Sequence, residues 1–219
     1  ALPLIALQYH EVKVVLNHLY GDSEFAITGN TLFCDYIYLD TDERRRFAQV
    51  SHEYLIEQVQ EQTLTNASGS SDLNFNHPVK ELIWIRNSGG FASDGCMDSV
   101  ASSNSTYQLK LNGHDRFAAR DYRYFTRTQV WQHHSGAGGL NCAATSPADG
   151  AFNDGIAVYS FALKPEEHQP SGTCNFSRID NAQLVATSNS GTPVANTIFA
   201  VNYNVLRIMS GMGGLAYSN

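Results

Sequence analysis

The sequence is poor in positive charge and has no long apolar run. Its 14 Lys and Arg residues are outnumbered by 21 Asp and Glu residues, which gives a formal net charge of −7. The basic residues form no stripe that follows a phosphate backbone, so we expect no direct nucleic-acid partner. The apolar runs are far shorter than the roughly 18–20 residues that cross a bilayer, so we expect no transmembrane insertion.

Cysteine is also scarce. The four cysteines are widely spaced and contain no C-x-x-C pair: Cys34, Cys96, Cys142 and Cys174. This spacing argues against a dense disulfide framework. We therefore expect reduced thiols and an intracellular setting. A chain of 219 residues is long enough to build one large β domain, or one domain plus a fragment, without a metal or disulfide.

Patterns for catalysis and cofactor binding are weak. The 8 histidines include no pair at i, i+4 on a plausible helix, and the adjacent His133 and His134 would point to opposite faces of a strand. No G-x-S-x-G motif is present, and Cys174 falls within a predicted strand, where a thiol is usually a small buried hydrophobe. We expect no catalytic residue, no cofactor and no metal site. Two carboxylates that converge in space stay an open alternative, and four acids lie in predicted loops: Asp115, Asp121, Asp149 and Asp154.

Alternation of apolar and polar residues predicts many short strands. Residues 1–40 read as two long strands, LIALQYHEVKVVL and TLFCDYIYLD, and a short exposed helix follows, with Asp40 as its N-cap and Glu43 completing a capping box. A domain boundary is predicted near Val50. Later strands are predicted in EYLIEQVQ, KELIWIR, TYQLKLNG, IAVYSFAL, TCNFSRIDNAQLVATS and AVNYNVLRIM. Many short strands with uneven connections indicate an all-β sandwich or jelly roll.

The stretch YSFALKPEEHQPSGTC, residues 159–174, contains acids, a histidine and a thiol, and so raises the question of a reactive site. We interpret it as a corner between two strands. Tyr159, Phe161 and Leu163 line one face of the first strand, Pro165 and Pro170 bracket the exposed turn, and Gly172 provides the return. Sequons for N-glycosylation occur in predicted loops at Asn66 and Asn104.

Several long motifs occur in a fixed order along the chain: LPLIALQYHEVKV, DYIYLDTDERRRFAQVSHEYLIEQVQ, LNFNHPVKELIW, LNGHDRFAARDYRYF, YSFALKPEEHQPSGTCNFSRIDNA and NYNVLRIMSGMGGLAYSN. They resemble the major capsid proteins of nucleocytoplasmic large DNA viruses, most of all those of the algal phycodnavirus and chlorovirus branch. The resemblance implies an antiparallel jelly-roll sandwich, the second of two in a double jelly-roll capsid protein. It maps residues 1–40 onto the last strands of the first jelly roll, 41–52 onto a connector helix and 53–219 onto the second jelly roll. We therefore expect the chain to be part of a longer protein.

The resemblance also implies a structural role in an icosahedral virion and no enzymatic activity. The expected assembly is a homotrimeric capsomer with a pseudo-hexagonal outline that contacts neighbouring capsomers and minor capsid proteins, assembled in the host-cell cytoplasm. Asn30 and Asn196 partly match the Ala/Gly-Asn-Thr context in which the algal-virus branch carries glycans. Candidate interface residues, chosen by loop position, are Phe117, Tyr122, Tyr124, Phe125 and Trp131. The alternatives are that these aromatics cap the sandwich's own core, or that the protein is a jelly-roll carbohydrate-binding module or glycosidase.

Overall fold

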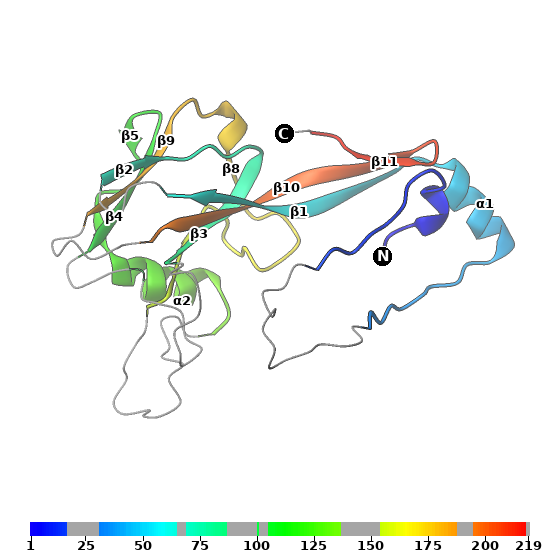
Figure 1. Cartoon of the computed structure of the whole chain (residues 1–219), viewed down its shortest axis with the longest axis horizontal. Coiled ribbons are helices and arrows are strands. Elements are labelled where there is room, and N and C mark those ends of the chain that lie inside the picture. The colour runs from blue at the N-terminus through cyan, green and yellow to red at the C-terminus, as the bar shows by residue number, and fades with distance from the viewer. Residues whose placement is uncertain are drawn as a thin grey trace, which may run out of the picture. The chain divides into compact units, whose positions relative to one another are not determined.

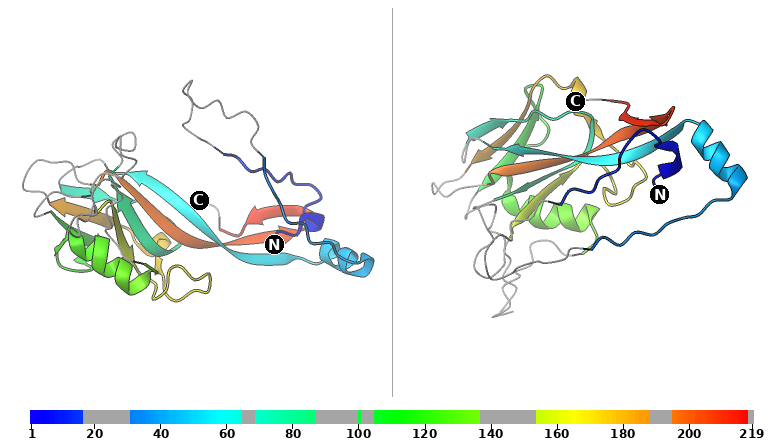
Figure 2. Two further views of the ribbon diagram at one scale, coloured as in Figure 1. Left: turned by 90° about the horizontal axis from the view of Figure 1, so that it is seen from below. Right: turned by 45° about the vertical axis from the view of Figure 1, so that its right-hand side comes forward.

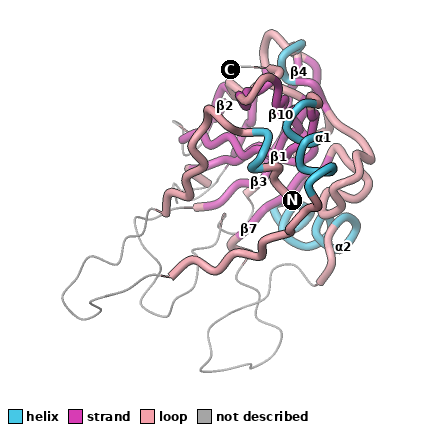
Figure 3. Tube along the Cα trace, turned by 90° about the vertical axis from the view of Figure 1, so that its right-hand side faces the viewer, coloured by secondary structure: helices cyan, strands magenta, loops and turns pink. Residues whose placement is uncertain are grey.

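The computed structural model describes residues 1–16, 31–64, 69–86, 100, 105–136, 154–187 and 195–217. The chain divides into two compact units. The larger unit comprises residues 55–204, and the smaller one comprises residues 1–54 together with 205–218. Two long strands, β1 (His52–Thr63) and β10 (Thr197–Met209), contribute residues to both units. Strands dominate the described chain and helices are few (Figure 3).

Two antiparallel sheets form the larger unit (Figure 1). The first has the order β1-β10-β3-β7, in which β3 is Pro78–Ile85 and β7 is Ile156–Ser160; the short β8 (Cys174–Asn175) also pairs with β3. The second has the order β2-β9-β4-β5, formed by Gly69–Asp72, Ala182–Thr187, Thr106–Leu111 and His114–Asp115. A further short strand, β6 (Arg120–Asp121), pairs with β4.

The chain crosses repeatedly between these sheets. The strands β1, β3, β7 and β10 belong to the first sheet, and β2, β4 and β9, which lie between them in sequence, belong to the second. The first and last long strands, β1 and β10, are neighbours in the first sheet. This alternation, with its interlocked Greek keys, defines a jelly roll. The predicted all-β, antiparallel jelly-roll fold is confirmed.

Cross-strand pairs explain how the core is filled. In β4, Tyr107 and Leu109 are 0% and 1% exposed, and they lie opposite Ala186 and Leu184 of β9. A large side chain thus faces a small one in the first pair, which permits close packing between the sheets. Trp84 of β3 lies 5.4 Å from the Tyr107 ring, so aromatic side chains from both sheets meet in the centre.

The open side of the sandwich along β7 is covered by a helical segment. It consists of a π-helical turn, η2 (Tyr124–Thr128), followed by α2 (Gln129–His133). Gln129 Oε1 accepts a hydrogen bond from the backbone N–H of Ser160 in β7, at 3.1 Å. Because β7 ends the first sheet, this bond satisfies a donor on its outer edge.

The smaller unit contains a 3-10 turn, η1 (Leu4–Ala6), the helix α1 (Thr41–Gln49) and β11 (Met212–Leu215), which folds back on β10 (Figure 2). As predicted, Asp40 caps α1, and its carboxylate accepts a hydrogen bond from the N–H of Thr41 at 2.7 Å. Gly211 turns the β10–β11 hairpin at φ +81°, and a Cβ there would lie 2.5 Å from the Tyr9 ring. The left-handed backbone favours glycine here, and a larger residue would have to displace the Tyr9 ring.

The structure differs from the sequence prediction in residues 1–40. Apart from η1, residues 1–16 and 31–40 contain no helix or strand, and residues 17–30 lie outside the described chain. The alternating pattern is present, but a strand forms only where a neighbour accepts and donates its backbone hydrogen bonds. Whether these segments are strands of a preceding jelly roll stays a prediction, as does the assignment of all of 53–219 to one domain.

Two further differences lie around the 159–174 corner. β7 ends at Ser160, because its hydroxyl donates to Ala162 O at 2.7 Å and accepts from Ala162 N at 3.2 Å, which bends the chain away. Leu163 is therefore 72% exposed rather than aligned with Tyr159 and Phe161, which pack against the core. Phe176, expected in a strand, lies in the 3-10 turn η4 (Phe176–Arg178), where the Asn175 side chain accepts from Ser177 N.

Candidate functional site

Four of the five aromatic candidates for an interface pack into the larger unit's own core. Phe125 is 0% exposed and lies 5.1 Å from the Trp84 ring, while Tyr122 is 8% exposed. Phe117 and Tyr124 are half-buried and contact Phe125 at ring distances of 5.4 and 5.1 Å. Trp131, in α2, is 75% exposed. The alternative expectation, core packing, thus describes four of these residues, and a role of any of them between subunits stays a prediction.

Buried hydrogen bonds hold Val100 and Ala195, which lie outside the strands. The Tyr107 hydroxyl donates to Val100 O at 2.6 Å and accepts from Ala195 N at 3.1 Å. Val100 and Ala195 are 0% and 1% exposed. Burial raises the pKa of Tyr107 to about 12, so the hydroxyl keeps its proton and stays a donor. One side chain therefore holds both a point between β3 and β4 and the residues just before β10.

A second anchor is centred on Asp154. Its carboxylate accepts from Thr126 Oγ1 at 2.6 Å and from Arg127 Nε and Nη2 at 2.9 and 2.6 Å. Its carbonyl accepts from Val100 N at 3.0 Å. Burial alone would raise the pKa of Asp154, but the hydrogen bonds from Arg127 and Thr126 outweigh it, and the pKa is lowered. This anchor joins η2 to the start of β7.

A third set of polar contacts closes the side of the sandwich at β1. Gln60 pairs with the backbone of Asn76 through both amide atoms, with Nε2 2.7 Å from Asn76 O and Oε1 3.0 Å from Asn76 N. Gln62 bonds in the same way to Asp72 O and Asn74 N. Gln60 and Gln58 also reach the buried side chains of β10, Asn202 and Asn204, both at 2.9 Å. This amide row was not predicted, because the predicted strand EYLIEQVQ ends at Gln60, whereas β1 continues to Thr63 and includes Gln62.

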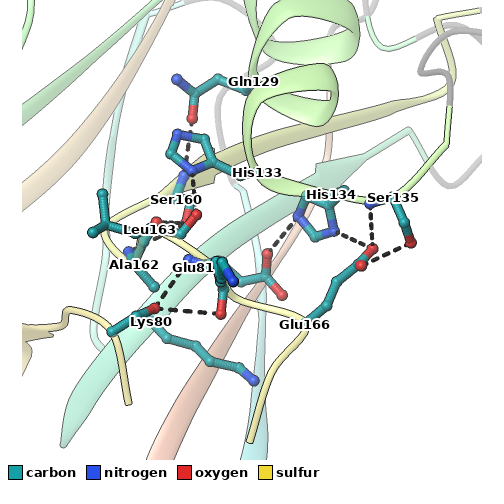
Figure 4. A network of polar contacts seen from close by, with 12 residues as sticks. Lys80, Glu81, Gln129, His133, His134, Ser135, Ser160, Ala162, Leu163 and Glu166 are labelled. Atoms are coloured by element: carbon teal, nitrogen blue, oxygen red, sulfur yellow. Dashed lines mark hydrogen bonds and ion pairs between the residues drawn. The ribbon is translucent and has the colours of Figure 1, made fainter. Parts of the chain in front are cut away.

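The PEEH corner takes part in a polar network around the end of α2 (Figure 4). Glu166 accepts from Ser135 N at 2.9 Å and from Ser135 Oγ at 2.7 Å. His134 places Nδ1 3.2 Å from Glu166 Oε1 and Nε2 2.9 Å from Glu81 Oε2. The two nitrogens of one imidazole thus face different carboxylates, which is an ion-pair arrangement and not a shared coordination sphere.

The carboxylates considered for glycoside hydrolysis have separate structural roles where they are described. Asp154 is held by Arg127, Asp121 accepts from Arg123 N at 3.0 Å, and Asp115 lies 3.8 Å from Lys110 Nζ. Asp149 lies outside the described residues. Across the described ranges, no group of three or more His, Cys, Asp or Glu is arranged to hold a metal ion. No described helix is both long and apolar enough to cross a membrane.

Of the four asparagines proposed as glycan carriers, Asn30, Asn66 and Asn104 lie outside the described residues. Asn196 is half-buried just before β10, and its backbone bonds to Ile85 O at 3.1 Å and Leu64 N at 2.7 Å. Its side-chain Oδ1 accepts from Thr197 Oγ1 at 3.3 Å. Glycosylation at all four positions stays a prediction.

Jelly rolls occur in virus-shell domains, lectin domains and cupins. The comparisons distinguish between these classes, because the family model for large eukaryotic DNA virus major capsid proteins matches residues 43–214. The chain belongs to this family. The predicted recognition is thereby confirmed, as is the expectation of a structural protein rather than an enzyme.

Individual relatives agree with the family match. The major capsid protein of Pyramimonas orientalis virus is 54% identical over 239 residues, covering 100% of this chain and 58% of that protein. That of Paramecium bursaria Chlorella virus 1 is 41% identical over 290 residues, covering 100% and 63%. The solved PBCV-1 virus capsid has a subunit that matches 84% of this chain and 56% of its own, with 38% identity and a TM-score of 0.61. The chain thus spans about three-fifths of the length of these relatives.

Proposed function

We propose that this chain is part of a major capsid protein that builds an icosahedral virus shell, with three copies forming each capsomer. The match of the capsid family model over residues 43–214 carries the proposal. The fold agrees with it, because a stiff two-sheet sandwich can be repeated many times, and many weak symmetric contacts then add up. The described carboxylates support it as well, since those suited to sugar chemistry are engaged in structural contacts.

The assembly state of the full-length protein tests this proposal. Light scattering after size-exclusion chromatography should give three times the subunit mass over a wide dilution range. A monomer that binds sugars on a glycan array would overturn it in favour of the carbohydrate-binding alternative. The proposed neighbours are other capsomers and minor capsid proteins, and the proposed location is the virion, after assembly in the host-cell cytoplasm.

We infer further that residues 1–40 supply strands to a preceding jelly roll in the longer protein, that 41–52 connect the two domains, and that 53–219 form the second. The apolar side chains of the first segment are unusually exposed here: Val14 72%, Phe33 90% and Tyr38 91%. Exposed apolar residues at this density indicate a surface that is covered in the complete protein. The greater length of the relatives is consistent with a further domain.

Hydrogen exchange on the full-length protein tests the domain assignment. Backbone amides of residues 9–16 and 31–38 should exchange at least about a hundredfold more slowly there than in the isolated chain, because strand pairing protects them. Equally fast exchange in both would overturn the assignment without affecting the trimer. For the glycans, mass spectrometry of protein from virions should find added sugar at Asn30, Asn66, Asn104 or Asn196, and unmodified peptides would refute each site in turn.

A further inference from the structure

The corner segment, defined as residues 161–173 between β7 and β8, folds tightly onto β3. Phe161 N and Ala162 N both donate to Lys80 O, at 2.9 and 3.2 Å. At its other end, Gly172 has φ +150° and approaches so closely that a Cβ would lie 2.6 Å from Phe161 O. The two ends of the corner segment are therefore fixed by backbone contacts, while its outer part depends on side chains.

Besides the Ser135 hydrogen bonds to Glu166, three histidines contact the outer part or its neighbours. His133 Nδ1 lies 3.1 Å from Leu163 O, and His134 Nδ1 lies 3.2 Å from Glu166 Oε1. At the far side, His168 Nδ1 lies 3.5 Å from Glu57 Oε1 of β1. The His168 side chain is 65% exposed, so solvent screens that pair and its contribution is small. The His134 side chain is only 18% exposed, so solvent screens its ion pairs less than that of His168.

The geometry at His134 requires a charged ring. A neutral imidazole carries one N–H and can donate to one acceptor only. Here both ring nitrogens face carboxylate oxygens, Glu81 Oε2 at 2.9 Å and Glu166 Oε1 at 3.2 Å. Within the described chain, neither Glu81 Oε2 nor His134 Nε2 has another hydrogen-bond partner, and both atoms are buried. If the ring loses a proton, one of these contacts becomes a repulsion between lone pairs.

The surrounding charges favour the protonated ring. From β3, Glu81 faces it directly, and the adjacent Lys80 is paired with Glu57 of β1 at 2.8 Å. From the corner segment, Glu166 faces it, while Lys164 is paired with Glu167 at 2.9 Å. His133, the last residue of α2, precedes it in the sequence. The hydrogen bond to Glu81 raises the pKa of His134, burial opposes this, and the charges of Glu81 and Glu166 add to the increase.

We propose that His134 is a pH-dependent fastener, which in its charged form ties the corner segment to α2 and β3 and in its neutral form releases it. The two states differ by one proton and by the contacts of Glu166. In the released state, the ring is exposed to water and titrates near its ordinary value of about 6.5. In the fastened state, it holds its proton to higher pH. Release is therefore favoured as pH rises, and the fastened corner is the state of neutral and mildly acidic solution.

The pH dependence has a defined form. Below the ordinary pKa of histidine, both states are protonated and the equilibrium is independent of pH. Between that value and the higher pKa of the fastened state, release liberates one proton, so the released population rises about tenfold per pH unit. Above the pKa of the fastened state, the ratio of released to fastened protein is again independent of pH. This profile is the signature of a single titrating group.

The experiment is hydrogen exchange, read by mass spectrometry, on the full-length protein between pH 6 and 9.5, with intrinsic exchange rates divided out. The Ser135 N–H, which donates to Glu166, and the amides of 161–173 report fastening directly. The expected result is a fall in their protection of about tenfold per pH unit within the window, with no change in the amides of β4 and β9. Protection that does not vary with pH would overturn the proposal.

Two variants separate the charge from the packing. In Glu81→Gln, the new amide can donate to Nε2 while a neutral ring donates from Nδ1 to Glu166, so the corner should stay fastened up to pH 9.5. In His134→Gln, protection of Ser135 should be low at every pH. The control is His114→Gln, because His114 is exposed in β5 and lies outside the corner, and it should match the wild-type profile. A wild-type profile in Glu81→Gln would also overturn the proposal.

Discussion

Arg127 and Asp154 form a two-pronged pair, with Nε 2.9 Å from Oδ1 and Nη2 2.6 Å from Oδ2. Asp154 is 3% exposed and has φ +49°, so it combines a buried charge with a left-handed backbone. Aspartate and asparagine tolerate this backbone better than most residues. The position therefore serves two purposes, and substitutions can separate them.

Replacing Asp154 by Asn should keep the left-handed backbone conformation and remove the negative charge that accepts hydrogen bonds from Arg127 and Thr126. We expect a loss of about 2–3 kcal/mol in the free energy of unfolding, the range of a hydrogen-bonded charge that loses its partner. Urea denaturation at pH 7 measures it. Arg127→Lys should lose a smaller part of this free energy, since Lys keeps the positive charge but cannot make the two parallel hydrogen bonds of the guanidinium group. Equal stability of wild type and Asp154→Asn would show that the pair contributes nothing.

The same carboxylate predicts a dependence on acid. Because the folded pKa of Asp154 is lowered from 3.8, its contribution is fully present above the unfolded value and is lost as pH falls through the folded one. Wild type should therefore lose stability relative to Asp154→Asn below about pH 4. Thermal unfolding of both proteins from pH 3 to pH 7 checks this, and parallel curves would contradict it.

Tyr107→Phe should keep the ring in the core and remove only the hydroxyl. Val100 O and Ala195 N, both in buried residues, would then lose a partner. The expected cost is about 1–3 kcal/mol, with hydrogen exchange increasing at residues 100 and 195 and not in the centre of β4. Uniform loosening of the whole sheet would instead point to altered ring packing.

Gln60→Ala should destabilise the β1 side of the sandwich by about 1–2 kcal/mol, since it breaks a paired amide contact with Asn76 and a bond to Asn202. Glu61→Ala is the matched control, because Glu61 is the next residue of β1 and is exposed on the opposite face. It should change the free energy of unfolding by less than about 0.5 kcal/mol. Similar losses in both variants would refute a specific role of the amide row.

Substitutions at Trp131 and Phe125 distinguish an effect on assembly from an effect on folding. Phe125→Ala should cost about 3–5 kcal/mol in unfolding free energy, because Phe125 is fully buried in the core. Trp131→Ala should leave the unfolding of the isolated chain nearly unchanged, since the side chain is 75% exposed, and should weaken the trimer of the full-length protein. Analytical ultracentrifugation measures the second effect. A trimer of unchanged stability would remove Trp131 from the list of interface residues.

Local alternation was sufficient to predict the sandwich, and the reason is visible in β4, where every apolar residue of TYQLKL points to the core. It was insufficient for residues 1–40, where the same alternation occurs without a neighbouring strand in the described chain. The end of β7 depends on the Ser160 hydroxyl, a local contact that competes with the strand and that no periodicity reveals.

The candidate site shows the same division. The corner at Pro165 was predicted, because proline and glycine mark turns directly. The meeting of His134 with Glu81 and Glu166 was not, since tertiary folding brings these residues together from the C-cap of α2, from β3 and from the corner. The spacing of these residues along the chain does not predict that their side chains meet. Only the tertiary fold brings them together.

The amide row on β1 has a consequence for the production of many identical subunits. Gln58, Gln60 and Gln62 face inward and make specific hydrogen bonds, while Glu57 and Glu61 face out. A slip of β1 by one residue would exchange the two faces, leaving acids against the partners of the amides. A subunit with β1 in the wrong register would lose these hydrogen bonds and be less stable. The amide row therefore specifies the register of a long edge strand, which could otherwise pair in more than one way.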